Sequence, residues 1–209
     1  MRIELNSIGK RFNREWIFRN VTLQFEPNTA TGIVGPNGSG KSTLLQCISG
    51  YLTTTSGSMQ FQNKNGIVAS EEVFKHVSMA TPYLDQEEWL TLREAIVLQK
   101  RFKPFRNGLK TKEILQRSGL EHAADKYIRQ FSSGMKQRSR LALAILADTD
   151  VLLLDEPASN LDKQGVQWFS ELLRSEKTNR TVIICSNHHP DELALTERQI
   201  DLSQFKPIG

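Results

Sequence analysis

The stretch Gly35-Pro-Asn-Gly-Ser-Gly-Lys-Ser42 matches the pattern GxxxxGK[ST] of a phosphate-binding loop. Its glycines let the backbone turn tightly enough for several amide N–H groups to point at one chain of phosphates. Lys41 adds a mobile positive charge for the terminal phosphates, and the Ser42 hydroxyl can ligate magnesium. We therefore expect a bound nucleoside triphosphate, held by Gly35, Asn37, Gly38, Ser39, Gly40, Lys41, Ser42 and Thr43.

The flanks of this loop agree with that prediction. Residues 30–34 are short and apolar enough for a buried strand, and residues 42–49 indicate a short helix that Gly50 closes. The amino terminus of a helix contributes about half a positive charge to an anion site. The alternative, a glycine-rich connection without a ligand, does not account for this strand–loop–helix context.

Length and composition exclude several classes of protein. The chain has 209 residues, of which 38% are hydrophobic and 24% charged, as in soluble globular proteins. A folded unit of this size buries about 70% of its unfolded surface and needs no disulfide or structural metal. Cys47 and Cys185 are expected to be small core residues in a reducing compartment. Since no apolar run approaches the ~20 residues of a membrane-spanning helix, we expect no span of its own.

The net charge of +4 is mild, but one stretch is densely basic. It contains Lys100, Arg101, Lys103, Arg106, Lys110 and Lys112, interleaved with Phe102 and Phe105. Such a patch could meet lipid headgroups or nucleic acid. A solvated face is the favoured interpretation, and no nucleic-acid partner is expected.

The pattern of apolar residues changes along the chain. The first thirty residues alternate as strands do, and residues 56–80 indicate further short strands with Asn65-Gly66 as a hairpin turn. Helices are expected across residues 91–125, beginning with a capping box at Thr91 and Glu94. From 135 onward, helices at 135–147 and 164–176 alternate with apolar strands at 151–154 and 181–185. This alternation predicts an α/β fold with a parallel sheet covered on both faces.

A second motif, Val151-Leu-Leu-Leu-Asp-Glu-Pro157, ends an apolar strand on two acids. Ligands lie at the carboxyl ends of strands in open α/β sheets. Asp155 can hold magnesium there, and Glu156 could orient or deprotonate the water that attacks the terminal phosphate. The alternative is a pair of acids that only cap the next turn.

A third motif, Phe131-Ser-Ser-Gly-Met-Lys-Gln-Arg138, places hydroxyl and small residues before a helix. The free N–H groups of such a helix start could form a second anion site. By itself the motif indicates no more than the beginning of a helix.

In order and spacing, GPNGSGKST, FSSGMKQR, LLLDEPASNLD and Asn187-His188 resemble the ATP-binding-cassette (ABC) ATPases across nearly the whole chain. The resemblance implies a P-loop NTPase core, a mostly parallel sheet flanked by helices, with an antiparallel β subdomain and a helical subdomain. It implies one domain over 1–209, with the helical subdomain at about 85–130 and the remainder of the fold in 1–84 and 131–209. Two such domains pair head to tail, as a homodimer or heterodimer, with each ATP between the two.

The resemblance also assigns roles to single residues. Ser132 and Gly134 would face the γ-phosphate bound by the partner subunit, and Asp162 would lie at the dimer seam. Glu156 would be the catalytic carboxylate, and His188 the histidine that contacts the γ-phosphate, with His189 as an alternative. Phe12 would stack on adenine, with Trp16 and Phe18 as alternatives.

The sequence departs from the family pattern in two places. Ser133 stands where the signature segment has glycine and Met135 where it has glutamine. The family also places a glutamine after the β subdomain, where this chain reads Val77-Ser-Met-Ala-Thr-Pro-Tyr83. Gln86 comes a few residues late, so its role could fall to Gln86, Thr81 or water.

The sequence thus predicts a Mg2+-dependent ATPase subunit that drives transport through a separate integral-membrane permease. We expect a cytoplasmic protein held at the inner face of the membrane by that permease, with export favoured because the chain shows no C-terminal regulatory extension. The alternatives are a soluble ABC-type ATPase, a phosphate-loop kinase, and a nucleotide-dependent binding module with weak turnover.

Overall fold

A five-stranded parallel sheet forms the centre of the computed structural model, which describes residues 1–84 and 86–206. The strands are β1 (Arg2–Phe12), β2 (Glu15–Phe25), β3 (Ala30–Val34), β4 (Ser56–Asn63), β5 (Gly66–Val68), β6 (Val77–Ala80), β7 (Val151–Asp155), β8 (Thr181–Ser186) and β9 (Arg198–Asp201). The α-helices are α1 (Lys41–Ile48), α2 (Val73–His76), α3 (Leu92–Phe102), α4 (Thr111–Ser118), α5 (Ser133–Leu146), α6 (Lys163–Glu176) and α7 (Pro190–Leu193). Short 3-10 helices lie at Ser70–Glu72, Arg106–Gly108, Glu121–Ala123, Ile128–Gln130 and Leu202–Phe205.

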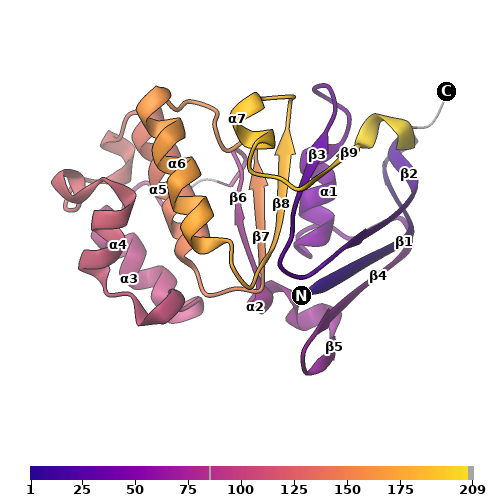
Figure 1. Ribbon diagram of the computed structural model, residues 1–209, viewed down its shortest axis with the longest axis horizontal. Coiled ribbons are helices and arrows are strands. Elements are labelled where there is room, and N and C mark those ends of the chain that lie inside the picture. Colours follow the sequence, from indigo (N-terminus) through magenta and orange to yellow (C-terminus); the bar gives the residue numbers. More distant parts are fainter. Residues whose placement is uncertain (85, 207–209) are drawn as a thin grey trace.

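The parallel sheet has the strand order β6-β7-β8-β3-β9 (Figure 1). The strands β3, β7 and β8 are buried along their whole length because both faces of the sheet are covered there, whereas the edge strand β9 is mostly exposed. Along β7, Leu152 and Leu154 belong to one hydrophobic core, whereas Val151 and Leu153 belong to another. Since neighbouring strands all run parallel, their carboxyl ends share one edge of the sheet.

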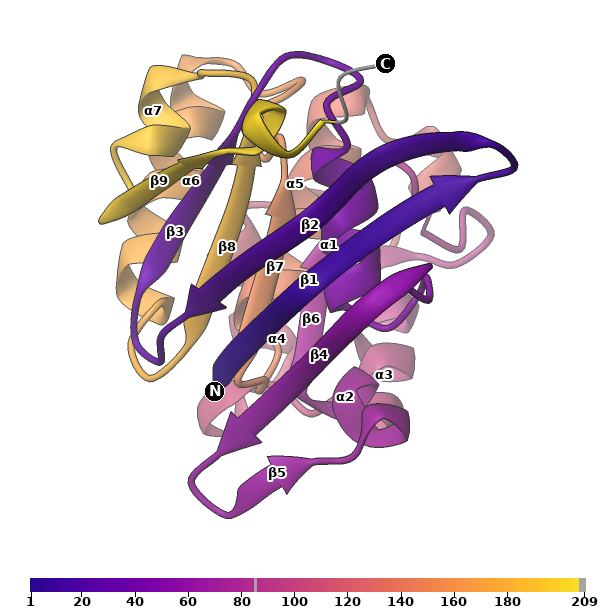
Figure 2. The same ribbon diagram turned by 90° about the vertical axis from the view of Figure 1, so that its right-hand side faces the viewer.

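The two cores lie on opposite faces of this sheet. On one face the strands pack against apolar residues of α3 to α6. On the other face they pack against α1 and an antiparallel sheet of order β2-β1-β4-β5, which faces the viewer in Figure 2. The chain therefore has the predicted α/β architecture, with helices and an antiparallel sheet around a parallel core.

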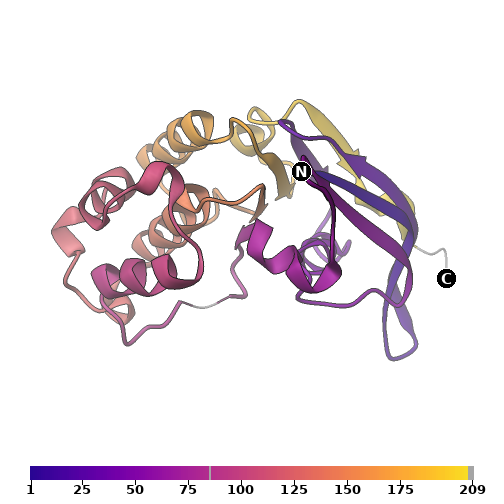
Figure 3. The same cartoon turned by 90° about the horizontal axis from the view of Figure 1, so that it is seen from below.

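Helices α3 and α4 form a lobe to one side of the two sheets (Figure 3). Thr91 and Glu94 make the predicted capping box at the start of α3. The buried carboxylate of Glu176, at the end of α6, forms ion pairs with Arg106 and Arg117 of the lobe. This carboxylate ties the lobe to the core.

The basic stretch at 100–112 is not a uniform solvated face. Phe105 is buried in the core, and Arg106 also donates hydrogen bonds to the Glu176 and Thr178 carbonyls, both at 2.9 Å. Lys103 Nζ donates to the Val77 carbonyl at 2.6 Å, and burial lowers the pKa of this lysine. Lys103, Phe105 and Arg106 therefore attach the lobe to the rest of the molecule, and the other members of the stretch are exposed.

Three local predictions were wrong. Residues 70–76 form a 3-10 turn and α2 rather than strands. In the β4–β5 hairpin Asn63 pairs with Gly66, so the turn residues are Lys64 and Asn65. The Asn65 N–H donates to Asn63 Oδ1 at 2.8 Å, and this local bond moves the turn one residue earlier than the Asn-Gly pattern predicts. Helix α5 also begins two residues before Met135, because Ser132 caps it.

Arg180 precedes β8 in the chain and is 1% exposed. Its side chain packs against the carboxyl end of α5. Its guanidinium donates to the Ile145 carbonyl at 2.6 Å, to Ser78 Oγ at 2.9 Å and to Thr149 Oγ1. Burial lowers the pKa of Arg180 to about 9. One buried side chain thus joins β6, the end of α5 and the start of β7.

We expect Arg180→Ala to lower the free energy of unfolding by about 2–4 kcal/mol, because it leaves a cavity and buried acceptors without their donor. Urea unfolding followed by circular dichroism measures the change. Arg174→Ala, at an exposed position on α6, should stay within about 0.5 kcal/mol of the wild type. A loss below about 1 kcal/mol for Arg180→Ala would show that water replaces these hydrogen bonds.

Candidate functional site

Three of the polar motifs of the sequence meet at the carboxyl edge of the parallel sheet. The phosphate loop follows β3, Asp155 ends β7, and residues 187–189 follow β8. Strand register places Val34 beside Ser186 and Asp155 beside Cys185. Segments about 150 residues apart in sequence are therefore neighbours at this edge.

The phosphate loop enters α1 through Gly40, which has a left-handed φ of 95°. A Cβ at Gly40 would lie 2.7 Å from Ile17 Cγ2, so both the backbone angle and the packing require glycine. The first turn of α1 contains no acidic residue, and its N–H groups face the loop. This geometry suits an anion.

Lys41 lies across the loop and is 5% exposed. Its ammonium group donates to the Gly35 carbonyl at 2.7 Å and to the Pro36 carbonyl at 3.1 Å. The hydroxyl of Ser39 is buried and has no hydrogen-bond partner among the described residues. A positive charge and an unused hydroxyl are thus held inside the loop, where phosphate oxygens would satisfy them.

Asp155 is 2% exposed, and its Oδ2 accepts a hydrogen bond from Thr81 Oγ1 at 3.3 Å. Its Oδ1 is buried and without a partner in the described part of the chain. Burial raises the pKa of Asp155, and the nearby Ser42 hydroxyl opposes this rise. A carboxylate oxygen without a partner beside a hydroxyl fits Mg2+, which prefers oxygen ligands.

Glu156 adopts a left-handed φ of 46°, which is uncommon for a residue of its type. Its N–H donates to the Cys185 carbonyl at 2.9 Å, and its own carbonyl accepts from Ser159 N–H at 3.0 Å. These bonds hold the strained turn and leave the half-buried side chain in the cavity described next. Strain of this kind concentrates at functional sites.

A cavity of about 550 Å³ opens over the phosphate loop, and we call it the phosphate-loop cavity. It is lined by Phe12, Ile17, Asn37, Gly38, Gly40, Lys41, Ser42, Thr43, Gln46, Tyr83 and Glu156. Of the three aromatics considered for stacking, only Phe12 lines it. Phe18 is fully buried, and the centroid of the Trp16 ring lies 5.4 Å from the guanidinium carbon of Arg11 and 5.0 Å from that of Arg19.

Ser132, Gly134 and Asp162 lie around a different cavity of about 290 Å³, which we call the Ser132 cavity. Ser132 Oγ accepts from Met135 N–H at 3.2 Å at the start of α5, and Asp162 Oδ1 accepts from Gly165 N–H at 2.7 Å at the start of α6. None of its lining residues also lines the phosphate-loop cavity. The structure therefore does not bring the third motif to the phosphate loop within one chain.

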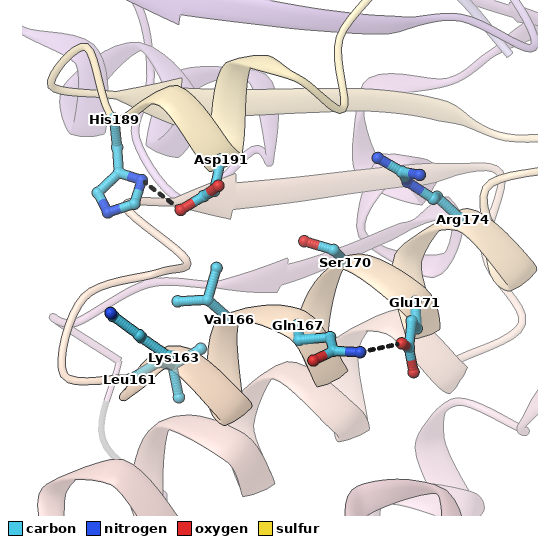
Figure 4. A pocket seen from close by; sticks show the side chains of 9 residues that line it. All are labelled: Leu161, Lys163, Val166, Gln167, Ser170, Glu171, Arg174, His189 and Asp191. Carbon is cyan, nitrogen blue, oxygen red and sulfur yellow. Dashed lines mark hydrogen bonds and ion pairs between the residues drawn. The ribbon is translucent and has the colours of Figure 1, made fainter.

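His188 and His189 have different neighbours. His188 has a left-handed φ of 58° and lies near Asp201, which in turn lies beside Gly35. Hydrogen bonds from Ser203 lower the pKa of Asp201, with a smaller contribution from His188. His189 instead pairs with Asp191 at 3.9 Å in a groove between α6 and α7 (Figure 4). This placement favours His188 as the histidine of the phosphate side.

The α6–α7 groove of Figure 4 has a volume of about 650 Å³, more than the phosphate-loop cavity. Its walls carry both signs of charge, such as Lys163 and Glu171, and Glu171 accepts a hydrogen bond from Gln167 at 2.9 Å. No residue of the phosphate loop lines it. Size alone therefore does not locate the site, whereas the chemistry of the lining residues does.

Glu192 is a residue of this edge that the sequence analysis missed. It is 2% exposed, and its Oε1 accepts from Ala158 N–H at 2.8 Å. Burial raises its pKa, opposed by a hydrogen bond with Ser186. Glu192 thus joins α7 to the turn after Glu156. Its place in the first turn of the helix after the two histidines was the only signal in the sequence.

The structure also separates the candidates for the missing glutamine. Gln86 Oε1 accepts a hydrogen bond from Ser139 Oγ of α5 at 2.6 Å, and its side chain lines a groove beside the lobe. Thr81 contacts Asp155 directly. Gln86 is therefore not shifted into the phosphate-loop cavity, and Thr81 is the candidate that contacts Asp155.

The family model described as ABC transporter matches residues 18–159 of this chain. The chain belongs to the ABC transporter family. It is an ATP-binding protein of this family, and its enzymatic activity is ATP hydrolysis. The helices in the described residues include none that is both long and apolar enough to cross a membrane.

Several ABC proteins are similar to it over most of its length. An uncharacterized ABC transporter ATP-binding protein of Bacillus subtilis, YybJ, is 30% identical, over 91% of this chain and 87% of that protein. The lantibiotic transport ATP-binding protein SrtF of Streptococcus pyogenes is 26% identical, over 89% of this chain and 80% of SrtF. The sulfate/thiosulfate import ATP-binding protein CysA of Escherichia coli is 31% identical, but the chain spans only 58% of CysA.

Solved ABC structures share the fold. A putative ABC transporter ATP-binding protein from Pyrococcus furiosus superposes with a TM-score of 0.82 at 18% identity, over 99% of this chain and all of that one. The ATP-binding cassette MJ0796, in a dimeric structure bound to ADP and phosphate, gives 0.82 at 22% identity, over 96% and 95% of the two chains.

Proposed function

We propose that this ABC protein is the ATPase subunit of a transporter and hydrolyses ATP at a head-to-tail dimer interface. The observation that carries the proposal is the division of anion-binding groups between two cavities. The phosphate-loop cavity holds Lys41 and Glu156, whereas the Ser132 cavity holds the start of a second helix. Two copies arranged head to tail would place each Ser132 cavity over the partner's phosphate loop, and ATP between them would close the dimer.

Within each site the residues have separate tasks. Lys41 and the N–H groups of the loop hold the phosphates, and Phe12 stacks on the base. Ser42 and Asp155 hold Mg2+, which when bound neutralises phosphate charge. Glu156 orients the attacking water and accepts its proton, and His188 contacts the terminal phosphate. Ser132, Gly134 and Asp162 act on the partner's nucleotide.

We further propose that an integral-membrane permease docks on the groove beside the lobe, in the helical subdomain at about 85–130. This groove, about 400 Å³, contains Leu84, Leu98 and Phe102. Phe102 and Leu98 are 78% and 39% exposed and line the same groove, and neighbouring exposed apolar side chains of this kind mark contact sites. Export is the proposed direction, and transport assays in vesicles of both orientations would decide it.

Copurification from solubilised membranes tests this function. We expect the wild type to bring down an integral-membrane protein and to release phosphate from ATP. Phe102→Glu should lose the membrane protein by placing a charge in an apolar contact, yet keep ATP binding. Phe74→Glu, at a 57% exposed phenylalanine on α2, is the matched control and should keep both.

The outcomes separate the alternatives. Hydrolysis by a protein that captures no membrane component would favour a soluble ABC-type ATPase. ATP binding without phosphate release, even beside the membrane component, would favour a nucleotide-dependent binding module.

A further inference from the structure

The described residues of the loop that follows β6 lie between two hollows of the molecule. Tyr83 lines the phosphate-loop cavity, whereas Leu84 and Gln86 line the groove beside the lobe. Among the described residues of this loop, Tyr83 is therefore the one that lines the phosphate-loop cavity. None of the motifs in the sequence pointed to this tyrosine.

Strand register brings the segment that contains Tyr83 to the part of the phosphate-loop cavity where Glu156 lies. Strands β6 and β7 are parallel, and Ala80 lies beside Leu154, so the residues that follow β6 run beside Asp155 and Glu156. Thr81 Oγ1 donates to Asp155 Oδ2 at 3.3 Å, and the Tyr83 N–H donates to the same Thr81 oxygen at 3.4 Å. The backbone of Tyr83 is thus tethered to the carboxylate that would hold magnesium.

Among the described residues of the loop, Thr81 and Gln86 each already have a hydrogen-bond partner, although Gln86 Nε2 is buried without one. The Thr81 hydroxyl is bonded to Asp155, and Gln86 Oε1 accepts from Ser139. Tyr83 is 70% exposed, and its hydroxyl has no hydrogen-bond partner among the described residues. A phenol is neutral at pH 7 and can donate to a phosphate oxygen without adding charge. The structure therefore offers a free donor at the end of the cavity that contains Glu156.

We propose that the Tyr83 hydroxyl donates a hydrogen bond to the terminal phosphate of the bound nucleotide. Tyr83 then distinguishes a nucleoside triphosphate from a diphosphate, because only the triphosphate carries the group that it contacts. This inference rests on the proposed nucleotide function of the cavity. It assigns Tyr83 a contact with substrate at the position where the sequence shows no glutamine.

Equilibrium binding of a non-hydrolysable ATP analogue and of ADP to Tyr83→Phe tests the proposal. Removing one hydroxyl should weaken binding of the ATP analogue by about 10- to 100-fold, the usual effect of a hydrogen bond to a charged group. Binding of ADP should change less than about twofold. The matched control is Tyr51→Phe, at a 65% exposed tyrosine that follows α1, and it should bind both nucleotides like the wild type.

The results that overturn the proposal are distinct from those that overturn the nucleotide site. Equal binding of the ATP analogue by Tyr83→Phe and Tyr51→Phe would refute the contact. Equal weakening for the ATP analogue and ADP would place Tyr83 at the base, ribose or inner phosphates and would also refute it. If the wild type bound neither nucleotide, or bound both no better than Lys41→Ala, the nucleotide function itself would fail.

Discussion

Replacing Glu156 with glutamine is expected to lower ATP turnover by about 100- to 1000-fold while ATP binding stays close to that of the wild type. Glutamine has nearly the same shape, so the left-handed turn and the bond from the Glu156 N–H to Cys185 should persist. What is lost is the carboxylate that accepts a proton from the attacking water. Phosphate release measures turnover, and fluorescence titration measures binding.

The same variant should accumulate as a closed dimer in ATP, because the reaction that opens the dimer is blocked. Size-exclusion chromatography with and without ATP would show this shift. Glu171→Gln, on the exposed face of α6, is the control and should turn over like the wild type. Turnover by Glu156→Gln within tenfold of the wild type would remove Glu156 from its catalytic role.

Replacing Asp155 with asparagine should have opposite effects on stability and on function. Without nucleotide, Asp155 is a buried carboxylate with one oxygen that lacks a partner, and burial raises its pKa. We expect Asp155→Asn to raise the free energy of unfolding at pH 7 by about 1 kcal/mol or more, since it removes this buried charge. It should also abolish the Mg2+ dependence of nucleotide binding and reduce turnover at least 100-fold, an estimate based on the loss of metal-assisted charge stabilisation.

The raised pKa of Asp155 also predicts how the stability of the wild type changes with pH. Because the pKa of Asp155 is raised in the folded protein, the folded state binds the proton more tightly than the unfolded state. The free energy of unfolding of the wild type therefore falls as the pH rises from the usual pKa of an aspartate to the raised pKa of Asp155. Above the raised pKa the whole cost of burying the charged carboxylate is present. The advantage of Asp155→Asn should accordingly shrink as pH falls below that window.

Urea unfolding of the nucleotide-free protein across this pH range would measure the difference. Asp125→Asn is the control with the opposite electrostatics, because hydrogen bonding with Arg93 lowers the pKa of that exposed carboxylate. It should not stabilise the protein at pH 7. An Asp155→Asn protein less stable than the wild type at every pH would show that the carboxylate is satisfied without a metal.

The sequence by itself determined the elements and the chemistry of the main motifs. The phosphate loop, the apolar strand that ends at Asp155 and the capping box at Thr91 are encoded in short windows. Each depends on local requirements: backbone freedom at glycine, burial on both faces of a strand, or a side chain three residues from its partner. Such requirements leave a pattern that one sequence reveals. Where a local hydrogen bond competed, as at Asn63 and Asn65, the pattern predicted the wrong turn residues.

Only the tertiary structure decided which side chains share a cavity. The strand order β6-β7-β8-β3-β9 is not the order of the chain, so it brings Thr81 to Asp155 and Tyr83 to the cavity of Glu156. The same packing turns Gln86 toward Ser139 and separates Ser132 from the phosphate loop. These relations depend on the register of strands and on contacts between residues far apart in sequence. Periodicity and spacing within a segment carry no information about them, because they describe only how a segment folds against its own neighbours.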